Sequence, residues 1–223
     1  MADRPFIDVD WIADHLDDVV EKLGQHLTLL LIPMMAGFAI ALILAILALR
    51  RPGTVGPVTM VTGLLYTIPS LAAFAVLRPI FGLSLWTAII PLVTYTLLIL
   101  YRNTVAGFRA VPAEVHEAAL GMGYTPRARL WRVELPLAVP LIMAGVRLAA
   151  VTTIGLVTVA SVIGADKFGG FGQFITEGLQ TNFNTKIYLG AMLSVVLAFS
   201  VDALLVILER ALTPWTRVRA ARG

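Results

Sequence analysis

Residues 117–136 read EAALGMGYTPRARLWRVELP, a polar stretch between two strongly apolar segments. The stretch carries three arginines, Arg127, Arg129 and Arg132, in a chain that is otherwise mostly compatible with lipid. A charged loop of this length needs a partner in water. The apolar segments on its two sides are long enough to cross a bilayer as helices.

The composition outside this loop is that of a membrane domain. Of the 223 residues, 58% are apolar and 14% are charged, whereas a soluble domain carries about a quarter charged residues. Continuous apolar runs without strand-like alternation favour helices over a barrel. We therefore expect an all-α integral membrane protein with five transmembrane helices, at about 27–49, 57–77, 84–101, 139–163 and 188–208.

Prolines lie within four of these spans. Pro33, Pro69, Pro91 and Pro140 each lack a backbone donor and predict a kink or a helix end. The span at 57–77 is the most polar of the five.

The distribution of Lys and Arg predicts the orientation, because cytoplasmic loops carry the excess. With the N-terminus outside and the C-terminus cytoplasmic, the charges divide 11 against 5, and Arg147 lies within a span. The cytoplasmic side then holds Arg50, Arg51, Arg102, Arg109, Arg127, Arg129, Arg132, Arg210, Arg217, Arg219 and Arg222. This bias places the loop 102–138 inside the cell without any use of a motif.

The domain organisation follows from the same pattern. Residues 1–26 form an extracytoplasmic segment, in which 8–26 show the periodicity of an amphipathic helix lying on the membrane surface, with Asp8 or Asp10 as its cap. Residues 27–210 form one transmembrane domain, and 211–223 a basic cytoplasmic tail. Within the loop we expect two short helices. The first starts at Pro112 and ends near Gly121 and Gly123, and the second runs from Thr125-Pro126 to Leu135-Pro136.

Several functions are excluded by what the chain lacks. It has no cysteine, and its three histidines are not at metal-ligand spacing, so no metal site is expected. No Gly-Lys pair occurs, so there is no phosphate-binding loop and the chain should not hydrolyse ATP by itself. We expect no catalytic residues, no cofactor and no nucleic-acid partner.

Two groups of residues inside the spans are candidates for function. Arg147 and Asp202 lie at similar depth in the fourth and fifth spans, and an intramembrane charge is costly unless it is paired. We expect them to form an ion pair that holds the two spans together, with a gating role as the alternative. Tyr66, Thr67, Ser70 and Tyr95 are candidates for a translocation path, since tyrosine faces attract quaternary ammonium groups.

The order of motifs resembles the permeases of the ABC-type glycine betaine/carnitine/choline (osmoprotectant) importer family. Residues 117–136 are similar to the EAA loop of importer permeases, with Val133 where isoleucine is usual, a swap of similar volume. The other segments that carry the resemblance are TIPSLA at 67–72, YRNT at 101–104 and AGVR at 144–147. The outer loop departs from the family at Asp166, Lys167 and Phe168.

The resemblance implies a type I ABC importer permease (MetI-like) fold in a multi-pass protein of the bacterial cytoplasmic membrane. It implies separate ABC ATPase subunits, an extracytoplasmic solute-binding protein, a small-molecule solute and a second permease, either a copy or a paralogue. It also implies that the ATPase is contacted through the coupling loop (residues 102–138). The residues expected to carry this contact are Glu117, Ala118, Ala119, Gly123, Arg127, Leu135 and Pro136.

Three alternatives stay open. The nearest is a permease of the same fold for another small solute such as methionine. A secondary transporter is disfavoured by the absence of an inverted repeat. A membrane scaffold without transport activity would make the loop pattern a coincidence.

Overall fold

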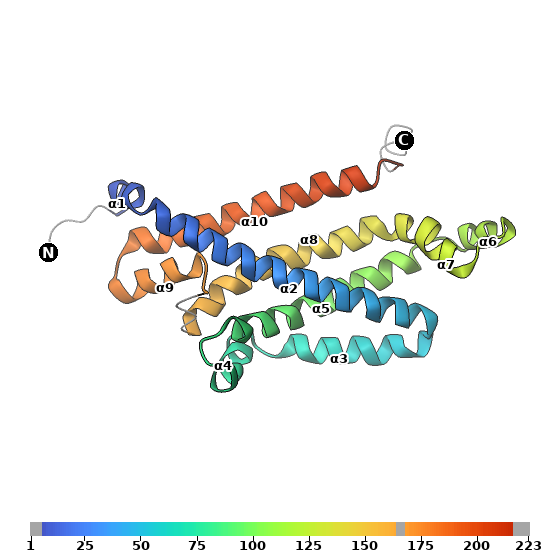
Figure 1. Ribbon diagram of the computed structural model, residues 1–223, viewed down its shortest axis with the longest axis horizontal. Coiled ribbons are helices and arrows are strands. Elements are labelled where there is room, and N and C mark those ends of the chain that lie inside the picture. Colours follow the sequence, from blue (N-terminus) through green and yellow to red (C-terminus); the bar gives the residue numbers. More distant parts are fainter. Residues whose placement is uncertain (1–5, 164–167, 216–223) are drawn as a thin grey trace.

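A computed structural model of the chain describes residues 6–163 and 168–215. All regular structure in these ranges is helical, and Figure 1 shows an elongated bundle in which the long helices run side by side. The helices are α1 (Val9–Asp14), α2 (Leu16–Arg50), α3 (Val55–Thr67), α4 (Ser70–Phe81), α5 (Leu85–Arg109), α6 (Ala113–Gly121), α7 (Pro126–Arg129), α8 (Leu135–Ala160), α9 (Gly172–Thr181) and α10 (Asn184–Leu212). Short 3₁₀ turns at Pro52–Thr54 and Ser161–Ile163 and a π turn at Leu130–Glu134 connect some of them.

Four described helices are long and apolar enough to cross a membrane, and α3 with α4 forms a fifth candidate span. This agrees with the five predicted positions but corrects the shape of the second. The chain bends by 85° between α3 and α4 instead of running straight through 57–77. Pro69 lacks the backbone N–H that would continue a helix and forces Ile68 into an extended conformation, with ψ 125°.

The other three prolines do not end their helices. Pro33, Pro91 and Pro140 lie inside α2, α5 and α8. The neighbouring helices supply the packing that keeps these segments helical, because in lipid a helix is the only way to satisfy the rest of their backbone.

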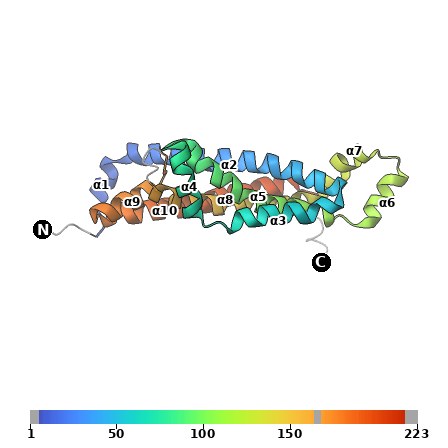
Figure 2. The same cartoon turned by 90° about the horizontal axis from the view of Figure 1, so that it is seen from below.

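The centre of the bundle is α5, which packs between α2 and α8. Small residues permit this close approach. A Cβ added at Gly37 of α2 would collide with the Thr96 side chain, and one added at Gly145 of α8 would collide with the Asn103 side chain, so both helices approach α5 closely at a glycine. By contrast, α10 lies at the edge of the bundle (Figure 1), where it packs mainly against α8 and α9 and keeps many apolar side chains exposed. Figure 2 shows α1 and α9 at one end of the bundle and α6 and α7 at the other.

The N-terminal segment differs from the expected surface helix at 8–26. It breaks at His15, and α2 runs from Leu16 without interruption into the first span. Asp8 is the cap of α1, because its Oδ1 accepts from the Trp11 N–H at 2.9 Å. The Asp8 N–H donates to Thr185 Oγ1 at 2.9 Å, which ties this segment to the start of α10.

The two ends of the bundle differ in charge. The C-terminal ends of α2, α5 and α10 lie at the same end as α6 and α7 (Figure 1), and these segments carry most of the arginines. The opposite end holds α1 and α9. Which end faces the cytoplasm stays a prediction from the charge bias, and the tail beyond Trp215, like outer-loop residues Asp166 and Lys167, lies outside the described residues.

Candidate functional site

The first helix of the coupling loop, α6, ends in a turn that requires glycine. The Tyr124 N–H donates to the Ala119 carbonyl at 3.1 Å, and the Gly123 N–H donates to the Leu120 carbonyl at 2.9 Å. This pair of bonds is the Schellman motif, which needs a left-handed residue after the helix. Gly123 supplies it with φ +77°, a conformation that costs other residues free energy.

The second helix starts as the sequence predicts but does not stop at Leu135-Pro136. Thr125 caps α7 by accepting from the Ala128 N–H at 3.3 Å. The helix then passes through the π turn Leu130–Glu134 directly into α8. Pro136 is the second residue of α8 and follows directly on the π turn. The loop is therefore physically continuous with a membrane-spanning helix.

A buried carboxylate, which the sequence did not single out, holds the two halves of the loop together. Glu134, with 8% of its surface exposed, accepts from Arg129 Nε at 2.6 Å through Oε1. His116 Nε2 of α6 lies 3.0 Å from the same oxygen. We call these three residues the loop brace. Nothing in the sequence signals it, because His116 and Glu134 meet only once the turn at Gly123 has formed.

The residues expected to contact an ATPase lie on different surfaces. Glu117, Ala118, Gly123 and Arg127 are exposed, whereas Ala119 is fully buried within the chain and so shapes the loop from inside. Leu135 and Pro136 are half-buried at the start of α8.

Three large apolar side chains on this loop are also exposed. The exposed fractions are 54% for Leu120, 68% for Met122 and 51% for Trp131. Apolar side chains exposed on a polar loop indicate a surface that another protein covers. The signal for them, large apolar residues within a charged stretch, was present in the sequence.

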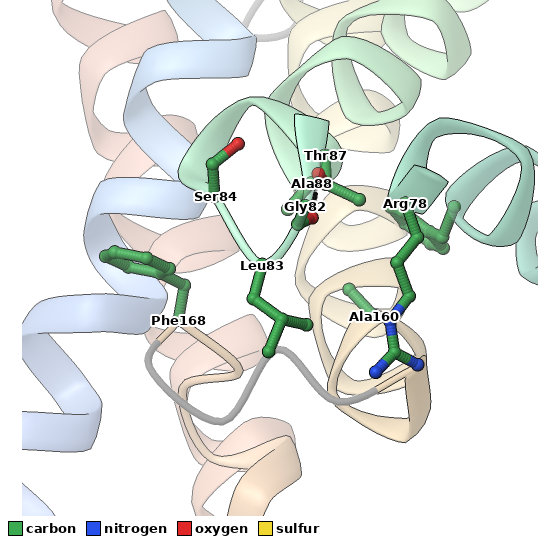
Figure 3. Close-up of a pocket in the computed structure, with 9 residues that line it drawn as sticks. Arg78, Gly82, Leu83, Ser84, Thr87, Ala88, Ala160 and Phe168 are labelled. Atoms are coloured by element: carbon green, nitrogen blue, oxygen red, sulfur yellow. Dashed lines mark hydrogen bonds between the residues drawn. The ribbon is translucent and has the colours of Figure 1, made fainter. Parts of the chain in front are cut away.

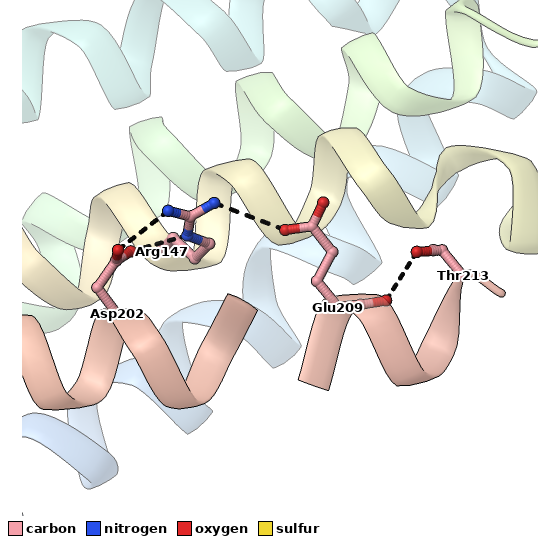
Figure 4. A network of polar contacts seen from close by, with 4 residues as sticks. All are labelled: Arg147, Asp202, Glu209 and Thr213. Atoms are coloured by element: carbon pink, nitrogen blue, oxygen red, sulfur yellow. Dashed lines mark hydrogen bonds and ion pairs between the residues drawn. The ribbon is translucent and has the colours of Figure 1, made fainter. Parts of the chain in front are cut away.

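Inside the bundle, Arg147 of α8 and Asp202 of α10 form an ion pair (Figure 4). Arg147 Nε donates to Asp202 Oδ1 at 2.7 Å and Nη2 donates to Oδ2 at 3.0 Å, a two-pronged contact. Glu209, about two turns further along α10, places Oε2 3.7 Å from Arg147 Nη1. The pair joins two helices, and its part in assembly or gating stays a prediction.

The four candidate path residues gather at the break between α3 and α4. The rings of Tyr66 and Tyr95 meet edge to face with centroids 5.7 Å apart, and the Tyr95 hydroxyl donates to the Ile68 carbonyl. Tyr95 is buried, while Tyr66 and Thr67 are exposed and Ser70 is half-buried. Two tyrosines far apart in the sequence thus share one location, and their role in transport stays a prediction.

A small pocket lies where the chain turns from α4 into α5 (Figure 3). Arg78 and Phe168 lie at its sides, and Thr87 Oγ1 donates to the Gly82 carbonyl at 2.8 Å. Its volume of ≈ 20 Å³ is enough for about one water molecule, so it is not a solute site. Within the described ranges, no group of three or more His, Cys, Asp or Glu residues could hold a metal ion.

The family model and the relatives that match this chain all describe membrane components of transport systems. A family model described as "Binding-protein-dependent transport system inner membrane component" matches residues 37–214. The choline transport system permease protein OpuBB of Bacillus subtilis is 35% identical over 92% of this chain and 94% of its own length. The carnitine transport permease protein OpuCB of Listeria monocytogenes is 40% identical over 96% of both chains. The osmoprotectant import permease protein OsmW of Salmonella typhimurium is 33% identical over 92% of this chain and 97% of its own.

Among solved structures, a chain of the MetNI methionine ABC transporter in inward-facing conformations has the same fold. It matches with a TM-score of 0.75 and 23% identity, over 87% of this chain and 96% of that chain. At this identity the likeness concerns the fold alone, and it confirms the expected MetI-like architecture.

Proposed function

Since the chain belongs to the family of inner membrane components of binding-protein-dependent transport systems, we propose that it is the permease subunit of an ATP-driven importer for a quaternary-amine osmoprotectant. Members of this family are non-catalytic, and a separate ATPase subunit hydrolyses ATP. The observation that carries the solute class is the similarity along nearly the whole chain to permeases named for choline, carnitine and osmoprotectants. The methionine alternative rests on a shared fold only.

The coupling loop supplies the surface for the ATPase. Leu120, Met122 and Trp131 are exposed apolar side chains of this loop, and Glu117 and Arg127 are exposed charged ones. An apolar centre with a polar rim is the usual anatomy of a protein interface. We therefore expect the ATPase to dock there, with the loop on the cytoplasmic side as the arginine bias predicts.

Movement at this surface would reach the membrane through α8. The helix continues from α7 through the π turn to Ala160, so a displacement of the loop displaces the span. Closure of the ATPase subunits then moves the spans of two permeases relative to each other, and the route between them opens to alternate sides. The second permease is a copy of this chain or a paralogue.

The test is reconstitution of the permease with its ATPase, its second permease and its solute-binding protein in proteoliposomes. We expect ATP-dependent uptake of glycine betaine, carnitine or choline, and no uptake of methionine. Uptake of methionine without uptake of any quaternary amine would overturn the solute assignment.

Coupling through the loop is tested by Glu117→Arg, which should abolish co-purification with the ATPase. The matched control is Glu21→Arg, because Glu21 is an exposed glutamate on α2 at the opposite end of the bundle. Retained ATPase binding in Glu117→Arg together with Gly123→Arg would overturn the assignment of this surface.

A further inference from the structure

A hollow on the side of the bundle, between α8 and α10, is open to the outside of the subunit and has a volume of ≈ 600 Å³. Most of its wall is apolar, but Arg147 and Asp202 face it. The apolar wall consists of Ala144, Leu148, Val151, Val195, Ala198 and Phe199.

The depth of the two charged residues in this hollow indicates that it does not face lipid. Arg147 lies about 18 Å along the helix from the start of α8, and Asp202 about 15 Å before the end of α10, so both are well within the apolar part of the bundle. Their side chains are 34% and 33% exposed. Lipid does not tolerate exposed charge at this depth, and such residues face a water-filled route or another protein. The α8–α10 face therefore points into the assembled importer.

The local charge is unbalanced. One guanidinium faces two carboxylates, those of Asp202 and Glu209, which gives the cluster a formal charge of −1. Asp202 occupies the Nε and Nη2 donors of Arg147. Nη1 is 3.7 Å from Glu209 Oε2, beyond ordinary hydrogen-bond distance, and can donate to a further partner.

Phe199 adds an aromatic ring to the charged groups of the hollow. Its ring lines the same hollow, three residues before Asp202 on α10, and is 73% exposed. An aromatic face attracts a quaternary ammonium group, which cannot donate hydrogen bonds and needs no dedicated acceptor.

We infer that the hollow lined by Arg147, Phe199 and Asp202 is the permease's own contact site for the quaternary ammonium solute as it crosses the membrane. Phe199 offers the ammonium head an aromatic face inside the hollow, and Glu209, which lies outside the lining about two turns along α10 from Asp202, adds negative potential from a distance. Arg147 Nη1 receives the carboxylate of solutes that carry one, such as glycine betaine. The openness of the hollow makes the contact weak, which suits a site that must release its solute. This inference rests on the proposed function.

Solutes of different charge test the site, because glycine betaine is a zwitterion and choline is a cation. Glu209→Gln removes the excess negative charge and leaves the Arg147–Asp202 pair intact. We expect choline uptake to fall about fivefold and glycine betaine uptake to fall less than about twofold. Phe199→Leu should lower uptake of both solutes about three- to fivefold, and Phe199→Trp should retain it.

The control is Leu204→Ala on an exposed part of α10 outside the hollow, and every variant is first checked for assembly by co-purification with the ATPase. An equal loss of both solutes in Glu209→Gln, or normal uptake in Phe199→Leu, would show that the cluster only holds the helices together and would overturn the site. Failure of the unmodified importer to take up any quaternary amine overturns the proposed function, and the site with it.

Discussion

The loop brace and the ion cluster of Arg147, Asp202 and Glu209, called the membrane cluster below, have opposite sets of charged groups. In the brace, one carboxylate, Glu134, holds two basic side chains, His116 and Arg129. In the membrane cluster, one guanidinium, Arg147, holds two carboxylates, Asp202 and Glu209. Each cluster joins segments that are distant in the sequence.

The difference lies in the surroundings. The brace is closed, since Glu134 is 8% exposed and both of its partners meet the same oxygen at 3.0 Å or less. It also lies at the end of the bundle, where water can solvate a group that loses its partner. The membrane cluster lies in the apolar part of the bundle, where an unpaired charge has fewer polar groups around it than at the bundle's end. The same deletion should therefore cost more in the membrane than in the loop.

The largest expected effect is that of Arg147→Gln. It leaves Asp202 and Glu209 without the cation that both contact, at a depth where unpaired charge is poorly tolerated. We expect the yield of assembled importer, measured by co-purification with the ATPase, to fall at least about tenfold. The double variant Arg147→Gln/Asp202→Asn removes one of the two unpaired charges and should recover most of the yield.

Asp202→Asn separates the two roles of the pair. It leaves Arg147 with Glu209 as its remaining partner, so assembly and uptake should fall together and less than in Arg147→Gln. Normal assembly with lost uptake would contradict the structural role and favour a direct part in transport, as a gate or as a solute contact.

A smaller effect is expected from Glu134→Gln in the loop. The substitution removes the charge that draws His116 and Arg129 together, while both basic groups remain able to reach water. We expect ATPase stimulation by the loaded binding protein to fall about three- to tenfold with the spans intact. Glu114→Gln, an exposed glutamate at the start of α6, is the control and should change nothing. If Glu134→Gln reduced assembly as much as Arg147→Gln, losing a charged group would cost as much in the loop as in the membrane.

The sequence predicted the features that depend on a single segment. Span positions, the cap at Thr125 and the turn at Gly123 follow from local composition and backbone preference. The meeting of Arg147 and Asp202 could also be anticipated, since both charges lie within spans and at matching depth. In each case, either the local sequence or the surrounding lipid strongly restricts the structure that can form.

Features that depend on three-dimensional context were missed or mistaken. The sequence predicted a helix end at Leu135-Pro136, where the structure has a π turn that leads into α8. The brace depends on the turn at Gly123. The 85° bend at Pro69 shows a related limit. The sequence marked a break at that proline, but its angle is set by contacts such as that between Tyr95 and Ile68.

Gly123→Ala disturbs the backbone turn of the loop without changing a charged group. An alanine at φ +77° carries a strain of about 1–2 kcal/mol, although nothing lies within 4 Å of the added Cβ. We expect ATPase coupling to fall several-fold, as in Glu134→Gln, because both changes loosen the approach of α6 to α7. Gly121→Ala is the matched control, since Gly121 is helical with open space around it and alanine favours helix. Equal losses in the two variants would show that bulk matters here and not the backbone conformation.

The smallest effect concerns an uncharged polar contact within the bundle. Tyr95→Phe removes the hydroxyl that donates to the Ile68 carbonyl at the α3–α4 break and keeps the ring against Tyr66. Loss of one neutral hydrogen bond costs about 0.5–1.5 kcal/mol, so the importer should assemble normally, with faster amide exchange confined to residues around the break. Tyr66→Phe, which leaves the Tyr95 bond in place, should not alter exchange there. If Tyr95→Phe impaired assembly as much as Arg147→Gln, then charge would not be what makes polar contacts in the membrane so costly to break.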